Sequence, residues 1–237
     1  MRPSSTLSLA ALCAGLAATP LAAQNVFTLD ELVFSASLTD VARDRTGVRV
    51  SRLTARDLAN GGRLQFSEFL ETLAGVNVTQ SGPIGTSATL RIRGLDSKYI
   101  PVRINGIDVT DPSSTQTQFD FGKLTSSGIA SAEVLYGSQS AILGSGAIGG
   151  AVNITTVDAP DEIGSEIGYN LEIGSFETMR TGLTYGTRFE RGFLAVSLSN
   201  TNTEGYSAAD ENAGNAEADG FESTDLSLRG EYQATDT

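Results

Sequence analysis

A strict alternation of apolar and polar positions begins near residue 162 and is the clearest pattern in the chain. One parity carries Ile163, Ile167, Tyr169, Leu171 and Ile173. The other parity holds small or polar residues only, namely Gly164, Glu166, Gly168, Asn170 and Glu172. Alternation with period two places the two sets on opposite faces of a β-strand, and the segment is about as long as a tilted membrane strand of roughly 9–11 residues.

Three further segments repeat this pattern, at 179–189, 193–200 and 224–232. Tight turns near Gly174 and at Arg191-Gly192 join the first three segments, and a polar loop over 203–222 joins the last two. Short turns on one side and longer loops on the other are typical of outer-membrane β-barrels. A soluble β-meander with one solvated face fits the strand pattern equally well, so the choice between them depends on the rest of the chain.

Between residues 41 and 157 the pattern changes to short strands mixed with short helices. A strand is predicted over 48–51, and Thr54 and Asp57 then have the spacing of a helix start that Asn60-Gly61-Gly62 would end. A second helix follows, with Ser67 near its N-cap and Gly75 at its end. Its apolar positions recur at helical spacing and are Phe66, Phe69, Leu70 and Leu73.

The remainder of this segment predicts strands around 76–79, 89–93, 132–136 and 151–156. The strongest hairpin signal is Asn105-Gly106 between Ile100–Ile104 and Ile107–Val109, because both turn positions tolerate a positive φ. A further short helix is predicted after the polar loop 110–118. The expected fold is therefore an α+β unit with a small mixed sheet, followed by about four antiparallel strands.

The first 23 residues have the features of a secretory signal. Arg2 precedes an apolar run from Leu7 to Leu16, and small residues lead to a cleavage site expected after Ala23. The chain is therefore expected to be exported. Four segments are predicted: a signal at 1–23, a short segment at 24–40, the α+β unit at 41–157 and the strands at 162–237.

Composition excludes several classes of function. The chain has no histidine and one cysteine, Cys13, which lies in the signal, so histidine- or cysteine-based nucleophilic catalysis and imidazole metal ligands are absent. The net charge of −12 without basic clusters argues against nucleic acid as a partner. An exported enzyme using carboxylates alone would need two acids roughly 5–9.5 Å apart, and the sequence offers no candidate pair. We predict that the protein is not an enzyme.

The motif Gly144-Ser145-Gly146-Ala147-Ile148-Gly149 satisfies the dinucleotide-binding pattern G-x-G-x-x-G. That pattern requires a helix after the glycines, with its N-terminus at the pyrophosphate. The residues that follow, 151–155, predict a strand instead. A phosphate site is therefore not expected here.

The whole stretch from Tyr136 to Ile154 closely resembles the end of the plug domain in TonB-dependent outer-membrane receptors, where a strand enters a Gly-Pro-x-Ser turn and leads to Gly-Gly-x-Val-Asn-Ile. Leu90–Leu95, Val102–Ile107 and Leu70–Val76 are similar to further plug motifs in the same order. The resemblance covers residues 48–156 and is closest to receptors of the cobalamin type. Tyr136 and Ser138 depart from the family's usual Arg and Pro.

The resemblance implies a TonB box just after the signal. Its residues are Asp30, Glu31, Leu32, Val33, Phe34, Ser35 and Ala36. An extended, unpaired segment of this kind would add as a strand to the sheet of the TonB C-terminal domain. The family usually has Thr and Val where this chain has Glu31 and Phe34, and an arbitrary tail remains the alternative.

The resemblance also implies contacts within the receptor. Arg93 would face carboxylates of the barrel wall, where a bidentate pair is favoured, or would be a solvated strand residue. Plug loops 80–87 and 108–118 would contribute to the outer ligand site, through Gln80, Ser81, Ser87, Asp108, Thr110, Asp111, Ser113 and Gln116.

Acidic residues on the loop 203–222 offer oxygen ligands for calcium. The candidates are Asp210, Glu211, Glu217 and Asp219. The favoured alternative is a solvated acidic loop, and no other cofactor is expected.

The predicted function is active uptake of a scarce nutrient, a metal–siderophore complex or a cobalamin, through the outer membrane of a Gram-negative cell. The expected partners are the TonB C-terminal domain, outer-membrane lipid and a small nutrient ligand. Four strands do not close a barrel, because an open edge in hydrocarbon leaves backbone groups unsatisfied, so the chain is expected to be an N-terminal fragment, with truncation favoured. The alternative is a soluble periplasmic ligand-binding module.

Overall fold

The computed structural model describes residues 47–113, 117–209, 213–215 and 217–235, together with the backbone of two short strands, β1 (Leu32–Val33) and β2 (Val41–Ala42). The predicted signal at 1–23 lies outside the described residues. Elements of the α+β unit (residues 47–157) are β3 (Val50–Thr54), α1 (Ala55–Asn60), α2 (Phe66–Glu71), β4 (Val76–Gln80), β5 (Ala88–Ile92), η2 (Ser97–Tyr99), β6 (Val102–Ile104), β7 (Ile107–Asp108), η3 (Phe121–Lys123), β8 (Ile129–Tyr136), α3 (Ser140–Leu143) and β9 (Gly150–Thr156).

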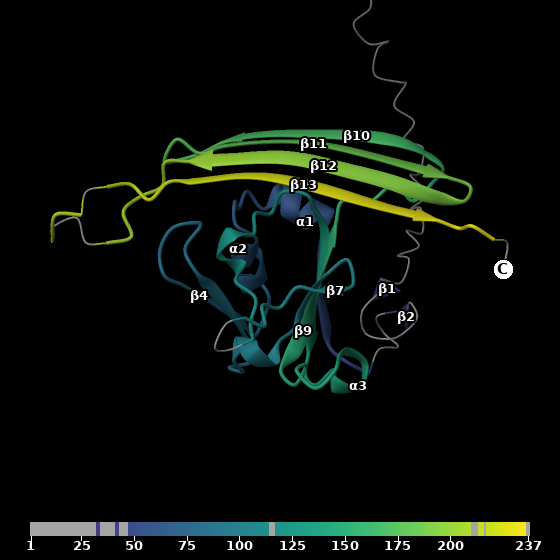
Figure 1. Ribbon diagram of the computed structural model, residues 1–237, viewed down its shortest axis with the longest axis horizontal. Helices are drawn as coiled ribbons and strands as arrows, with labels where there is room; N and C mark the ends of the chain where they lie inside the picture. The colour runs from purple at the N-terminus through teal and green to yellow at the C-terminus, as the bar shows by residue number, and fades with distance from the viewer. Residues whose placement is uncertain are drawn as a thin grey trace, which may run out of the picture. The chain divides into compact units, whose positions relative to one another are not determined.

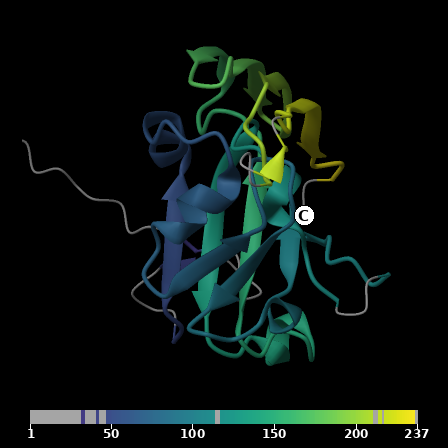
Figure 2. The same cartoon turned by 90° about the vertical axis from the view of Figure 1, so that its left-hand side faces the viewer.

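A mixed five-stranded sheet is the centre of the α+β unit, in the order β3-β8-β9-β6-β7. Only β6 and β9 run parallel in it, and the other neighbours are antiparallel. The hairpin β4–β5 forms a separate two-stranded ribbon, which lies across the larger sheet (Figure 2). The predicted small mixed sheet is confirmed.

The core of this unit lies between the ribbon, helix α2 and the larger sheet. Phe66 and Leu70 of α2 are completely buried, and they share a cluster with Ile92, Val134 and Ile154. Burying a side chain of this size contributes about 1.5–3 kcal/mol of hydrophobic free energy. Because this core holds α2, the ribbon and the larger sheet together, it also fixes the positions from which the connecting loops start.

Local signals account for most of the element boundaries. Thr54 caps α1 through a capping box with Asp57, and the helix ends before Gly61. The hairpin turn has positive φ at Asn105 (51°) and Gly106 (82°), as the Asn-Gly pair predicts. The 144–149 glycine motif leads into β9 rather than a helix, so the geometry of a dinucleotide site is absent.

Helix α2 starts two residues earlier than the sequence predicts. Its N-cap is Gln65, whereas Ser67, expected near the cap, is buried inside the first turn. Gln65 is held extended by an antiparallel bridge to Thr125, and this long-range contact sets the helix start. The first strand also begins at Val50 instead of residue 48.

The C-terminal strands form one antiparallel sheet, β10-β11-β12-β13, which runs along the α+β unit (Figure 1). Its strands are β10 (Gly164–Ile173), β11 (Met179–Phe189), β12 (Gly192–Thr203) and β13 (Phe221–Tyr232). Strands β12 and β13 each extend three residues further into the polar loop than predicted, and β12 also begins one residue earlier, at Gly192. The expected fold class, an α+β unit followed by an open set of antiparallel strands, is confirmed.

No helix among the described residues has the length and apolar character needed to span a membrane.

Replacing Thr54 by Ala should destabilise the α+β unit by about 1 kcal/mol, because it removes the N-cap of α1. Hydrogen bonds from Thr54, with a smaller contribution from the charge of Arg56, hold the pKa of Asp57 below its ordinary value of 3.8. Since the carboxylate is favoured in the folded state, this stabilisation is complete at neutral pH and is lost as the pH falls below about 3.8. Denaturant unfolding of the detergent-purified protein at pH 7 and pH 3 measures both effects.

Arg56→Ala, an exposed change on the same helix, is the matched control and should leave the midpoint at pH 7 nearly unchanged. An equal loss for the two variants would show that the capping box contributes nothing.

Candidate functional site

The two faces of the β10–β13 sheet differ in composition and in exposure. On β12 every second residue is buried, and these residues are Phe193, Ala195, Ser197, Ser199, Thr201 and Thr203. The opposite face is apolar and open, with Tyr169 88%, Leu226 71% and Leu228 70% exposed. The small polar face is the inner face, covered by the α+β unit, and the apolar face is the outer one.

One segment of the α+β unit, residues 125–128, contacts three neighbouring strands of the sheet. The Thr125 hydroxyl donates to Asp225 Oδ2 on β13 over 3.2 Å, and Arg180 on β11 donates to the Ser126 hydroxyl. Gly128 packs so closely against β12 that a Cβ atom added to it would lie 2.8 Å from Ser197 Oγ. This docking segment therefore fits against the sheet by small side chains and polar contacts.

A second contact is made by the linker between the α+β unit and β10. Asp158 accepts from Arg229 Nη1 at 2.7 Å, and Arg188 donates to the carbonyl of Pro160. Both guanidinium groups also lie over the ring of Phe193, at 5.3 Å for Arg188 and 5.1 Å for Arg229. The linker is therefore fixed to the inner face by two arginines of the sheet.

The first predicted ligand loop, 80–87, is an ordered turn. The Ser81 N–H donates to the carbonyl of Ser87 over 3.2 Å, and the Gln80 side chain donates to Pro83 O over 3.0 Å. The loop also contacts the end of the sheet: a Cβ on Gly85 would lie 2.8 Å from the Phe221 ring, and one on Gly82 would lie 2.9 Å from Ala208. Loops of the unit and of the sheet meet here.

Asp120, which the sequence analysis did not single out, holds this loop in place. Its Oδ1 accepts from the N–H groups of Ala88 (2.8 Å) and Gly122 (2.9 Å). The Gly85 N–H donates to Gly122 O over 2.9 Å. One carboxylate therefore joins the first loop to helix η3.

The second predicted ligand loop has different neighbours. Within it, the Thr110 N–H donates to Asp108 Oδ1 (2.9 Å) and the Ser113 N–H to Asp111 Oδ1 (2.8 Å). The bonds from Ser113 lower the pKa of the exposed Asp111. Gln116 lies outside the described residues. The loop borders a cavity of about 510 Å³ whose lining includes Lys98, Asp108, Thr110 and Gly144–Gly146.

Comparison with known proteins identifies the α+β unit. Residues 42–151 match the family model described as the TonB-dependent Receptor Plug Domain. The chain carries the plug of a TonB-dependent receptor. Among curated proteins, a vitamin B12 transporter, BtuB, of Photobacterium profundum is 33% identical over 145 residues, covering 61% of this chain and 23% of the relative. The BtuB of Vibrio vulnificus is 27% identical over 213 residues, covering 88% of the chain and 34% of the relative.

Similar solved structures include a siderophore receptor and an alcaligin outer-membrane receptor. The siderophore receptor PirA of Acinetobacter baumannii has a TM-score of 0.59 at 26% identity, covering 79% of this chain and 29% of that receptor. The alcaligin outer-membrane receptor FauA of Bordetella pertussis has a TM-score of 0.58 at 17% identity, covering 73% and 30%, and shows the fold alone. The chain spans about a quarter to a third of the length of the curated relatives it matches. The predicted family and outer-membrane location are confirmed.

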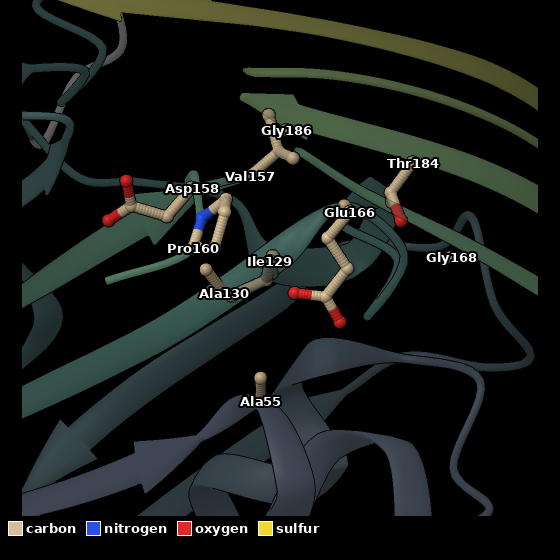
Figure 3. A pocket seen from close by; sticks show the side chains of 11 residues that line it. Ala55, Ile129, Ala130, Val157, Asp158, Pro160, Glu166, Gly168, Thr184 and Gly186 are labelled. Atoms are coloured by element: carbon tan, nitrogen blue, oxygen red, sulfur yellow. The ribbon is translucent and has the colours of Figure 1, made fainter. Parts of the chain in front are cut away.

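A cavity of about 280 Å³ lies between the plug and strands β10 and β11. Gly168 and Gly186 leave room for it on the sheet, and Gly128 and Ala130 do so on the plug. Figure 3 shows the Glu166 side chain projecting from β10 into this space, towards Ile129 and Ala55 of the plug. The cavity shows that the plug touches the inner face at defined places and leaves gaps between them.

Among the described residues, Arg93 contacts an aromatic ring. Its exposed side chain lies over the ring of Tyr136, 5.0 Å from the centroid, with Arg49 at 5.3 Å from the same ring. Charged groups of the sheet that contact the plug or its linker include Arg180, Arg229 and Asp225. Tyr136, which stands where the family usually has Arg, attracts Arg93 by a cation–π contact. A pair between Arg93 and a wall carboxylate stays a prediction.

The docking residues Thr125, Ser126, Arg180 and Asp225 were missed in the sequence. A weak signal for Arg180 was present, since it is the first inward position of β11 and precedes the small residues Gly182, Thr184 and Gly186. A long cation next to small residues on the same face of a strand indicates that its side chain reaches a more distant partner.

The acidic loop is only partly described. Asp219 Oδ2 accepts from the Ala208 N–H at 2.7 Å and so stabilises the loop itself, while Asp210 and Glu211 lie outside the described residues. Among the residues that are placed, Glu217 and Asp219 included, no group of three or more acidic side chains could hold a metal ion. Calcium binding stays a prediction.

The predicted TonB box is described at two positions only. Leu32 and Val33 form β1 and pair antiparallel with Val41 and Ala42 of β2. Asp30, Glu31, Phe34, Ser35 and Ala36 lie outside the described residues. The box was expected to be unpaired, and at these two residues its backbone is already in a strand.

Asp120→Ala should loosen the first loop, because it leaves the Ala88 and Gly122 N–H groups without their acceptor. A lost partner for a buried amide costs about 1–3 kcal/mol, so hydrogen exchange at these two amides should accelerate roughly tenfold or more. Hydrogen-exchange mass spectrometry on peptides covering residues 84–90 and 119–124 measures it. Asp96→Ala, which removes only a bond to Ser97, is the control, and equal exchange in both variants would contradict the role of Asp120.

Proposed function

We propose that this protein acts as a TonB-dependent outer-membrane receptor that takes up a scarce, bulky nutrient. The observation that carries the proposal is the pairing of a plug domain with a sheet whose inner face is small and polar and whose outer face is apolar and exposed. No covalent chemistry is needed. The plug would close the passage, and movement of the plug would open it.

The exposed outer face supports a membrane environment. Most of the large apolar side chains on it are 42–88% exposed, on all four strands. Soluble proteins rarely expose continuous apolar patches of more than a few hundred Å². In a membrane these side chains would not contact water, since hydrocarbon chains cover the outward side chains of a transmembrane strand. A soluble periplasmic module, the alternative function, would leave the same face in water.

The ligand is proposed to be a cobalamin or a metal–siderophore complex. Curated relatives at 26–33% identity are vitamin B12 transporters, and a solved relative at 26% identity is a siderophore receptor. The outer site would include loop 80–87, which meets Phe221 and Ala208 at the end of the sheet. Loop 108–118 would contribute from the adjacent cavity.

Energy for plug movement is proposed to come through TonB. A strand-forming segment near the N-terminus, with β1 at Leu32–Val33, supplies the backbone N–H and C=O groups for strand addition to the TonB C-terminal domain. Its present pairing with β2 involves two residues on each side, so exchange for a longer strand of TonB would gain backbone hydrogen bonds.

Cells that carry the protein should accumulate labelled cyanocobalamin or a labelled ferric siderophore in a TonB-dependent manner. Val33→Pro should lower uptake at least tenfold while leaving surface binding of the ligand unchanged, because proline removes a backbone N–H needed for strand pairing. Val33→Ala keeps that N–H and is the matched control. Uptake of neither ligand class by the unmodified protein, or full uptake by the proline variant, would overturn the proposal.

Leu226→Arg should prevent stable insertion in the outer membrane. An arginine on the lipid face near the middle of the bilayer costs about 2–4 kcal/mol, whereas Leu226→Ala at the same position should be tolerated. The amount of folded, heat-modifiable protein in outer-membrane fractions distinguishes the two. If the arginine variant inserts as well as the alanine variant, the outer face does not contact lipid.

A further inference from the structure

Arg180 of the sheet reaches into the body of the plug. Its side chain is 8% exposed, and its Nη2 forms an ion pair with Glu172, its cross-strand partner on β10. Its Nη1 donates to the Ser126 hydroxyl and, over 3.4 Å, to the carbonyl oxygen of Arg63. One guanidinium therefore connects a carboxylate of the sheet with two acceptors of the plug.

The arrangement of the three partners of position 180 requires an arginine there. A guanidinium is planar and has several N–H donors in a fixed fork, so it can bind partners in different directions at once. The Ser126 hydroxyl accepts from Arg180 and donates to the carbonyl of Arg63 at 2.9 Å, which uses both of its hydrogen-bonding roles. Glu172 compensates the buried charge. A lysine could keep the ion pair but would lose the fork.

The plug side of this contact leads to the outer ligand loop. The Ser126 N–H donates to Leu64 O (3.0 Å), next to the Gln65–Thr125 bridge. The buried Gln65 side chain donates to Gly122 O over 3.3 Å, and the same oxygen accepts from the Gly85 N–H. Three successive hydrogen-bonded steps therefore join the docking segment 125–128 to loop 80–87.

We propose that Arg180 is a wall-side latch: it holds the docking segment 125–128 against the sheet in the resting receptor and sets how readily that segment leaves the wall. The proposal deepens the proposed function, because a plug that moves must break this contact. Arg180 acts as a positioning residue and need not touch the ligand. Its loss should open the docking segment locally while the plug core stays folded.

A cysteine reporter can measure this opening. The only cysteine of the chain is Cys13, so a mature chain cleaved after Ala23 has no background thiol. Ser127 lies within the docking segment, and its buried hydroxyl has no hydrogen-bond partner among the described residues, so Ser127→Cys should change little. Ser67, also buried without a partner for its hydroxyl, lies in α2 and serves as a second reporter, for unfolding of the plug core.

The experiment measures the rate of maleimide labelling of each reporter while the protein is in the outer membrane. Each rate is divided by the amount of folded protein. Arg180→Gln and Ser126→Ala should each raise the labelling rate at position 127 by roughly tenfold, without changing the rate at position 67. Arg180→Lys should give an intermediate rate. Arg188→Gln removes a charge from the same strand and face but contacts the linker, so it should leave the rate at position 127 unchanged.

A double-mutant cycle decides whether the two residues act together. If they form one latch, Arg180→Gln combined with Ser126→Ala should label no faster than the faster single variant. Unchanged labelling at position 127 in both single variants would overturn the proposal, as would equal acceleration at both reporters. Ser126→Ala provides the test if Arg180→Gln fails to assemble.

The outcome is separable from that of the proposed function. Labelling needs neither ligand nor TonB, so a receptor that transports nothing could still show the latch. Conversely, TonB-dependent uptake with unchanged labelling at position 127 would reject the latch and leave the transport proposal intact.

Discussion

The two faces of the β10–β13 sheet have to satisfy opposite environments, and this constraint explains most of the molecule. Inward positions are mostly small or polar because they lie against a folded domain, and outward positions near the middle of the strands are mostly large and apolar. A shift of one residue in any strand would exchange the two sets. The observed register keeps Ser197, Thr184 and Ser227 on one face and Val196, Tyr185 and Leu228 on the other.

The plug meets this inner face through contacts that are specific but few. The plug side contributes hydroxyl groups, backbone carbonyls and glycines, and its linker contributes the carboxylate of Asp158. The sheet side contributes Arg180, Arg229 and Asp225. A large apolar interface would be costly to separate in water, whereas polar contacts can exchange partners with water. The cavity beside β10 and β11 reduces the contact further. Such an interface suits a domain that has to be held closed and later moved.

Much of the fold could be predicted because its signals are local. The period-two alternation gave the four strands, the Thr54–Asp57 spacing gave the start of α1, and Asn105-Gly106 gave the hairpin. Errors arose where distant residues decide the outcome. The start of α2 depends on a bridge from Gln65 to Thr125, which lies sixty residues later in the sequence.

The site was harder to predict than the fold for the same reason. The contact of Arg93 with the ring of Tyr136 was not predicted, because it becomes visible only in three dimensions. Ser126 carries no signal in the sequence and Arg180 only a weak one, and the packing of the plug against the sheet brings them together. Loop 80–87 was found by its composition, whereas Asp120, which holds it, was not.

The central claim is that β13 and its neighbours form a wall with lipid on one face and the plug on the other. A spin label placed in turn at each position from 223 to 231, in membranes, tests this claim most directly through collision with oxygen and with a water-soluble nickel complex. Oxygen accessibility should peak at every even position, where Leu226 and Leu228 lie, and both quenchers should be excluded at the odd positions, where Asp225 and Ser227 face the plug. If the nickel complex reached the even positions as readily as oxygen does, the outer face would lie in water and the account would be contradicted.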